Sequence, residues 1–133
     1  MGDTMEYIAL TGISDNVMRE LKNHVLRTIE IRSPNNFLAA LHLNAGDYVF
    51  LTHTSAQDLT GGNIGVIARV QKHQIATHRL VHSNEMLYEE CEMTMARIQL
   101  EPKCTARIRK IVGNEIGEIT RVDAEEISCY EAW

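Results

Sequence analysis

The sequence predicts an α+β fold, with a closed or half-closed small β-barrel and two short helices near the N-terminal end. Apolar residues recur at helical spacing in two stretches near the front of the chain, whereas runs typical of strands occupy five to seven segments. A chain of 133 residues can bury a single core. We therefore expect one domain that spans residues 1–133.

The first strand is predicted to lead directly into the first helix. Residues 6–13 carry β-branched and aromatic side chains, which favours a strand. Ser14 and Asp15 then suit a helix start, because a serine hydroxyl caps the first N–H groups and a carboxylate is stabilised at the positive end of the helix dipole. Apolar residues at helical spacing extend this helix to about His24.

A second strand and a second helix follow in the same way. Residues 26–33, LRTIEIRS, alternate polar and apolar side chains as a half-buried strand does. The pair Ser33-Pro34 predicts the next helix start, because it supplies a capping hydroxyl and a first-turn proline. The expected apolar stripe of this helix consists of Phe37, Leu38 and Leu41.

The remaining chain reads mainly as strands. Residues 48–52 are mostly apolar, which predicts a central strand covered on both sides, and residues 60–70 predict a glycine-rich turn into a strand. One face of that strand is expected to carry Ile64, Val66, Ala68 and Val70. Residues 73–92 fit neither period. Strand patterns return over residues 93–112 and near residues 126–130.

The charge of the chain limits the kinds of partner that it can bind. A net charge of −5 argues against a protein that coats nucleic acid or an anionic membrane by bulk electrostatics. A local basic site is still allowed, because the charges are unevenly distributed. A basic segment contains Arg97, Lys103, Arg107, Arg109 and Lys110, and an acidic segment follows with Glu115, Glu118, Asp123, Glu125, Glu126 and Glu131.

The basic segment has two interpretations. Arg107 and Arg109 share one strand face, and Lys110 follows them. The functional interpretation takes these three residues as candidate contacts to nucleic-acid phosphates. The structural interpretation, which the pattern favours, is a solvated outer face.

The cysteines and the other reactive side chains suggest no cofactor. Three cysteines (Cys91, Cys104, Cys129) without paired spacing fit a reducing cytoplasm, and we expect neither a secretion signal nor a membrane anchor. Cys104 is the best placed for reactivity, because Lys103 and Arg107 are near it. A small core side chain is the commoner role. The glycines at 61, 62 and 65 precede a strand rather than a helix, so they predict a hairpin turn and not a phosphate cradle.

Three histidines raise the question of a metal site. In a strand, His78 and His82 would lie about 13 Å apart, too far for one ion, and His73 would point to the other face. In a helix, His78 and His82 could pair, with a third ligand such as Cys91. We expect no metal, because no ligand-type spacing supports the site.

The strand LRTIEIRS carries the main candidate site. Thr28, Glu30 and Arg32 would line one face, opposite Ile29 and Ile31. That polar face is either a solvent face with a cross-strand ion pair or the wall of a pocket. The position of the strand, between two short helices and just before a strand buried on both sides, favours the pocket.

These residues resemble a known motif. The strand Arg27-x-x-Glu30-x-Arg32, followed by a short helix, Gly46-Asp47 and an apolar strand, resembles the activating-signal-cointegrator homology (ASCH) domains of the PUA-like superfamily of small β-barrels. Their signature, Gly-x-Lys-x-x-Glu-x-Arg, lies in a cleft beside the barrel. In this chain Arg27 replaces the lysine and Val25 replaces the glycine.

The resemblance implies a function, and the departures from the motif modify it. Many PUA-like proteins bind RNA, and some small ASCH-like proteins are amidohydrolases of modified nucleosides that require the motif lysine. A buried lysine can lose its proton to act as a base, whereas arginine keeps its charge. We therefore expect RNA or a nucleotide-like small molecule to bind a cleft lined by Arg27, Thr28, Glu30 and Arg32.

Two other functions remain open. One is an amidohydrolase that uses Glu30 as acid or base with Thr28 or Arg27. The other is a protein interaction module that docks through the acidic tail and Trp133. Over its whole length, from YIALTGIS through GDYVFLT to SCYEAW, the chain also resembles the archaeal domain-of-unknown-function family 473, found in methanogens. That resemblance implies no activity.

Overall fold

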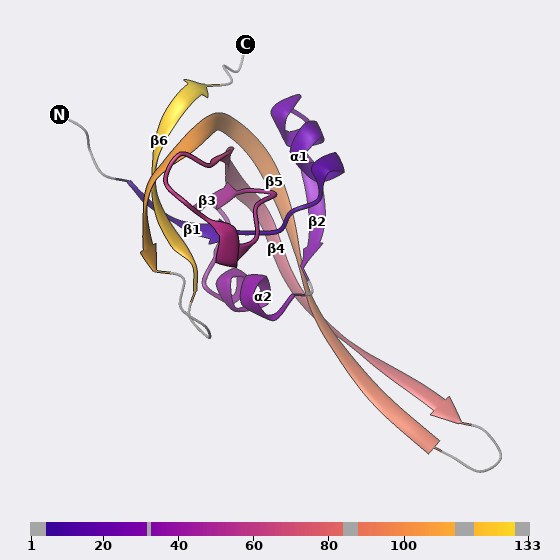
Figure 1. The fold of residues 1–133 in the computed structure, drawn as a ribbon. Coiled ribbons are helices and arrows are strands. Elements are labelled where there is room, and N and C mark those ends of the chain that lie inside the picture. Colours follow the sequence, from indigo (N-terminus) through magenta and orange to yellow (C-terminus); the bar gives the residue numbers. More distant parts are fainter. Residues whose placement is uncertain (1–4, 32, 84–87, 114–118, 130–133) are drawn as a thin grey trace.

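The computed structural model describes the backbone of residues 5–31, 33–83, 88–113 and 119–129, and the side chains of the same residues except 76–83, 88–95 and 128–129. The described chain contains six strands, two α-helices and one 3-10 helix (Figure 1). In order these are β1 (Glu6–Leu10), α1 (Asp15–Lys22), β2 (Arg27–Ile31), α2 (Pro34–Leu41), β3 (Tyr48–Leu51), η1 (Ala56–Asp58), β4 (Ile64–Ser83), β5 (Tyr88–Gly113) and β6 (Arg121–Cys129). The α+β class and the two N-terminal helices are confirmed.

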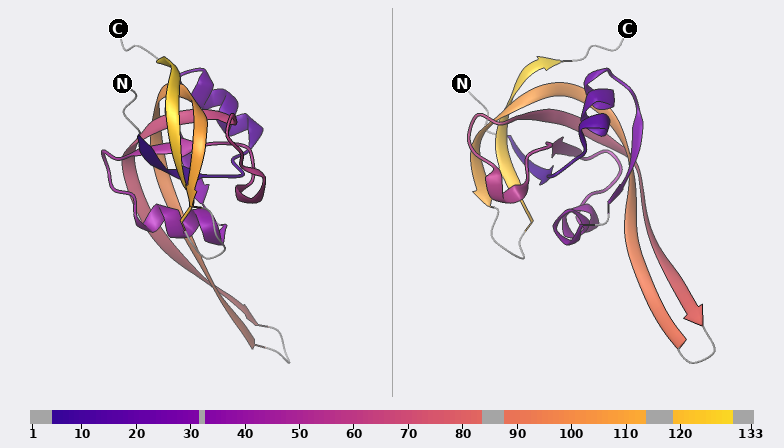
Figure 2. Two further views of the ribbon diagram at one scale, coloured as in Figure 1. Left: turned by 60° about the vertical axis from the view of Figure 1, so that its left-hand side comes forward. Right: turned by 45° about the vertical axis from the view of Figure 1, so that its right-hand side comes forward.

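The strands form one sheet with the order β2-β5-β4-β3-β1-β6, and β6 makes a second pairing with β5. β1 and β3 are parallel, whereas the other pairs are antiparallel. Figure 2 shows the strong curvature that lets β5 pair with β2, β4 and β6. Of the predicted closed or half-closed barrel, the structure shows a curved sheet that is not fully closed, because β2 pairs with β5 alone among the described strands and leaves an open edge.

Two apolar clusters form the core, one on each face of the central strands. The cluster under the helices contains Leu10, Leu51 and Val66, together with the apolar residues of β2. The opposite cluster contains Phe50 and Ile67 with side chains of β5 and β6. Because neighbouring residues of β3 enter different clusters, this strand is buried on both faces as predicted, except at its exposed first residue, Tyr48.

The helices begin where the sequence predicts, but one of them packs differently. Ser14 and Ser33 are the N-caps, and each hydroxyl accepts a hydrogen bond from the first turn. In α2 the predicted stripe is confirmed at Phe37, which packs partly buried against the core, but it is wrong at Leu38 and Leu41, which are exposed. The buried face consists of Asn36, Ala39 and Ala40. Small side chains let the helix backbone approach the sheet closely, and this arrangement places the Asn36 amide against β1.

β4 and β5 continue past the body of the protein as a two-stranded arm (Figure 1). The pairing runs without a break from Lys72 and Gln99 to Ser83 and Tyr88. This arm contains residues 73–83 and 88–92, the described part of the segment that had no clear period in the sequence. A ribbon that projects from the body has no face that must be apolar throughout, so alternation is not required.

Each α-helix has eight residues. Within the described ranges, no helix has the length and apolarity needed to cross a membrane.

Candidate ligand-binding site

A cleft of about 830 Å³ lies along β2. Its walls come from five parts of the chain: all five residues of β2, the β1–α1 connection at residues 11–14, Val17 of α1, the start of α2, and residues 55–57 at η1. Both helix N-caps, Ser14 and Ser33, are among the lining residues. The cleft therefore lies where the open edge of the sheet meets the N-terminal ends of the two helices.

The residues of β2 alternate as the sequence predicts. Ile29 and Ile31 are buried in the core, whereas Thr28 and Glu30 are exposed on the other face. All of them also line the cleft, as expected when a strand presents its edge. Arg27, Thr28 and Glu30 thus come together at one cleft, and Arg32 lies outside the described residues.

The guanidinium of Arg27 is ion-paired through one nitrogen, whereas another of its nitrogens is an unsatisfied donor among the described residues. Its Nη1 lies 2.9 Å from Glu20 Oε2 of α1, and the side chain is 41% exposed. Its Nε is buried and has no hydrogen-bond partner within the described ranges. A buried N–H without an acceptor is costly, so this atom marks a place where a ligand acceptor would be stabilising.

Glu30 makes a cross-strand ion pair. Its Oε1 lies 3.2 Å from Arg97 Nη2, on the residue directly opposite it in β5. The two side chains are 42% and 48% exposed, so this pair is accessible to solvent and contributes little to stability. The cross-strand ion pair and the pocket, which the sequence offers as alternatives, both exist at this strand.

Asn36 fixes the floor of the cleft. Its Oδ1 accepts a hydrogen bond from Thr11 N at 3.0 Å, and its Nδ2 donates to Thr11 O at 2.7 Å. The neighbouring Asn35 donates to Thr120 Oγ1 at 3.2 Å. Both asparagines line the cleft, and the two hydrogen bonds between Asn36 and Thr11 hold α2 against the end of β1. The sequence does not predict a role for these two residues, because they appear in it only as two amides that follow a helix cap.

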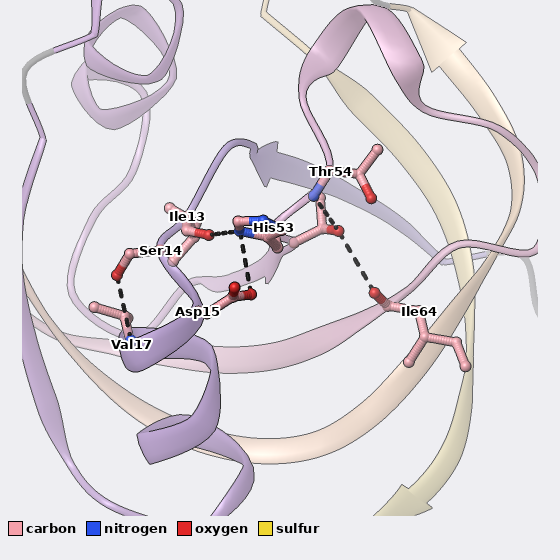
Figure 3. Close-up of polar contacts among 8 residues, drawn as sticks. Ile13, Ser14, Asp15, Val17, His53, Thr54 and Ile64 are labelled. Carbon is pink, nitrogen blue, oxygen red and sulfur yellow. Dashed lines mark hydrogen bonds and ion pairs between the residues drawn. The ribbon is translucent and has the colours of Figure 1, made fainter.

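The wall at residues 11–14 is tied to the segment after β3 (Figure 3). Gly12 N and Ile13 N donate to the backbone oxygens of Thr54 and Thr52, each at 3.0 Å. His53 Nδ1 lies 2.6 Å from Ile13 O and 3.5 Å from an Asp15 carboxylate oxygen. Gly12 has φ +64°, a conformation that glycine adopts without strain, and it turns the chain from β1 towards α1.

The basic segment lies beside the acidic one. Arg107 faces Glu125 across β5 and β6, with 3.9 Å between Nη1 and Oε1. Arg109 Nη2 lies 3.3 Å from Asp123 Oδ1, and the Asp123 side chain is 5% exposed. Lys110 is exposed, opposite Asp123 in the register. These arginines belong to cross-strand pairs away from the β2 cleft, and their role as nucleic-acid contacts stays a prediction.

The histidines of the arm lie in a strand. His73 Nε2 is 2.7 Å from Ala40 O, so this ring joins the base of the arm to α2. His78 and His82 are four residues apart in β4, a spacing of about 13 Å. Their side chains and that of Cys91 lie outside the described ones. Among the side chains that are described, no group of three His, Cys, Asp or Glu residues is placed to hold a metal ion.

Fold and cleft together define a small α+β protein with a six-stranded curved sheet and a cleft at an edge strand. Comparison with known proteins identifies its family. The model described as "Protein of unknown function (DUF473)" matches residues 5–122, and the chain belongs to this family.

One relative is the "Uncharacterized protein MJ0105" of Methanocaldococcus jannaschii, which is 29% identical over 100 residues. The alignment covers 75% of this chain and 62% of that relative, so the chain spans less than two thirds of the relative's length. No solved structure matches the chain.

Proposed function

We propose that the protein binds a nucleotide-like small molecule, or an exposed nucleotide of an RNA, in the cleft along β2. The observation that carries the proposal is the convergence of Arg27, Thr28 and Glu30 on one cleft of about 830 Å³. This volume lies within the range of about 300–1,000 Å³ that is usual for small-molecule sites.

The chemistry of the lining suits a nucleoside better than a long polyanion. Arg27 and Glu30 are the two charged residues among the described ones that line the cleft, and their formal charges cancel. Most of the other polar groups are hydroxyls and amides, from residues such as Thr28, Ser33 and Asn35. Such groups both donate and accept hydrogen bonds, as the edge of a base and a ribose require.

Arg27 supports the presence of an acceptor on the ligand. Its buried Nε lacks a partner in the part of the chain that the structure describes, and its guanidinium is also the group that replaces the lysine of the ASCH motif. A phosphate or carbonyl oxygen bound there would satisfy the donor. We also propose that the curved sheet is a PUA-like barrel. The second pairing of β6 with β5 supports this, because it brings β6, at one end of the strand order, next to the strand that pairs with β2 at the other end.

A thermal-shift screen against nucleosides, nucleotides and short RNAs tests the proposal. Ligand at about 100 times its dissociation constant adds about 2.7 kcal/mol of apparent stability, which is a readily measured rise in Tm. The rise should be lost in Arg27→Ala and in Glu30→Ala. It should persist in Arg107→Ala, a matched control that removes an exposed arginine paired with β6. Absence of a rise with every ligand, or equal loss in the control, would contradict the proposal.

Salt dependence separates a confined site from a phosphate-tracking surface. The logarithm of the RNA binding constant should fall with the logarithm of salt concentration with a slope shallower than about −5, because few phosphates reach the cleft. A steeper slope would indicate that RNA binds another surface of the protein, with more phosphate contacts.

A second candidate is hydrolysis of a modified nucleoside or another small amide. The observation that favours it is the placement of a hydroxyl and a carboxylate, Thr28 and Glu30, on the same cleft wall. In this case Glu30 would act as acid or base towards the bound amide. Chromatographic release of product by the parent protein, abolished in Glu30→Gln with ligand binding retained, would establish the enzyme. Ligand binding without release of product would exclude the enzyme and support a protein that only binds its ligand.

A further inference from the structure

Two of the three cysteines meet in the sheet although they are far apart in the sequence. Cys104 of β5 and Cys129 of β6 are register partners in the second pairing of β6. Residues directly opposite each other on antiparallel strands have Cα atoms about 4.5–5.5 Å apart. A disulfide requires Cα atoms about 4.4–6.8 Å apart, so the backbone already holds the two positions at a suitable distance.

The third cysteine is remote from this pair. Cys91 is the register partner of Leu80 in the arm, about 40 Å along an extended strand from Cys104. Within one chain, only one of the three combinations of cysteines is therefore close enough to be bridged.

We propose that Cys104 and Cys129 form a dithiol–disulfide pair that links β6 covalently to β5. The oxidant class is a small disulfide such as glutathione disulfide. One cysteine thiolate attacks it and releases one glutathione thiol. The second cysteine then attacks the mixed disulfide and releases the other. Two protein thiols and one glutathione disulfide thus give one protein disulfide and two glutathione thiols, which balances atoms and electrons.

The position of the pair decides what the bridge does. Cys104 is 1% exposed in the core cluster between the strands, so a disulfide there is shielded from reductants. Cys129 is the last residue of β6, and a strand end opens locally at low cost, which gives the oxidant access. The bridge closes a loop from β5 to β6 and holds β6 in its second pairing. In a reducing cytoplasm, which the sequence predicts, the pair rests as two thiols.

The test uses the full chain in glutathione buffers of increasing oxidation, followed by alkylation, intact mass measurement and peptide mapping. We expect the parent protein and Cys91→Ser to lose two alkylatable thiols together and to give a peptide that joins residues 104 and 129. Cys129→Ser should retain Cys104 as an alkylatable thiol after unfolding. The oxidised form should also melt about 10 °C higher than the reduced form, because a loop of this size constrains the unfolded chain.

Two results would overturn the proposal. One is that Cys104 and Cys129 stay alkylatable, or carry glutathione singly, in the most oxidising glutathione buffer. The other is a disulfide that contains Cys91. Because the readout is made on the parent chain, neither result depends on whether a cysteine variant folds.

Discussion

Replacing Asn36 by alanine should destabilise the protein more than replacing the neighbouring Asn35 does. The Asn36 side chain is the only described group that binds both the N–H and the C=O of Thr11, and both residues are buried, at 8% and 7% exposure. Alanine would leave both backbone groups of Thr11 without their partner. It would also remove the contact between α2 and the end of β1.

The size of the effect follows from these two hydrogen bonds. A buried polar group left unsatisfied costs about 1–3 kcal/mol, so the loss of two partners should lower the free energy of unfolding by about 3 kcal/mol after partial rehydration. A chain of 133 residues unfolds with an entropy of about 0.28 kcal/mol/K near its Tm. The Tm should therefore fall by about 10 °C.

Asn35→Ala is the matched control, because it removes an adjacent amide that makes one hydrogen bond, at 3.2 Å, to Thr120 Oγ1. This variant should lose about 1 kcal/mol, or about 4 °C in Tm. Calorimetry or circular dichroism of both variants measures the difference. If Asn36→Ala melts no lower than Asn35→Ala, the assignment of Asn36 as the support of the cleft floor is refuted.

Three further predictions concern the sheet. Gly65→Ala should prevent folding or cost several kcal/mol by urea titration, because its Cβ would overlap the carbonyl oxygen of Leu51. Burial, and then nearby carboxylates, raise the pKa of Tyr7 above 10.0, so the stability that it contributes is present below pH 10 and lost above it; Tyr7→Phe should show a smaller alkaline fall in Tm. A hydrogen bond from Lys103 lowers the pKa of Glu101 below 4.5, so the small stability advantage over Glu101→Gln should be present near neutral pH and disappear in acid.

The local features of the fold could be predicted from the sequence because each depends on neighbouring residues. The helix caps at Ser14 and Ser33 and the alternation of Ile29 and Ile31 in β2 are of this kind. The prediction for α2 failed where tertiary packing overrides the apolar pattern. Against a closely packed sheet, small residues such as Ala40 are buried and the larger Leu41 is left in solvent.

The long-range features had no local signal. The pairing of β6 with β5 places acidic residues beside basic ones, so Arg109 faces Asp123 instead of an open surface. The same pairing brings Cys104 opposite Cys129. The Asn36–Thr11 contact also joins residues 25 positions apart. Such contacts depend on strand order and register, which periodicity along the chain does not specify.

The most direct test of the proposed function is a ¹H–¹⁵N NMR titration of the protein with the nucleotide that stabilises it most in the thermal screen. A site in the β2 cleft predicts saturable shifts in the amides of Gly12, Thr28, Ser33 and Ala56, which line it from four sides. The amide resonances of residues around Arg107 and Arg109 should not shift. Shifts confined to the β5–β6 surface, or no saturable shift with any nucleotide, would contradict the account.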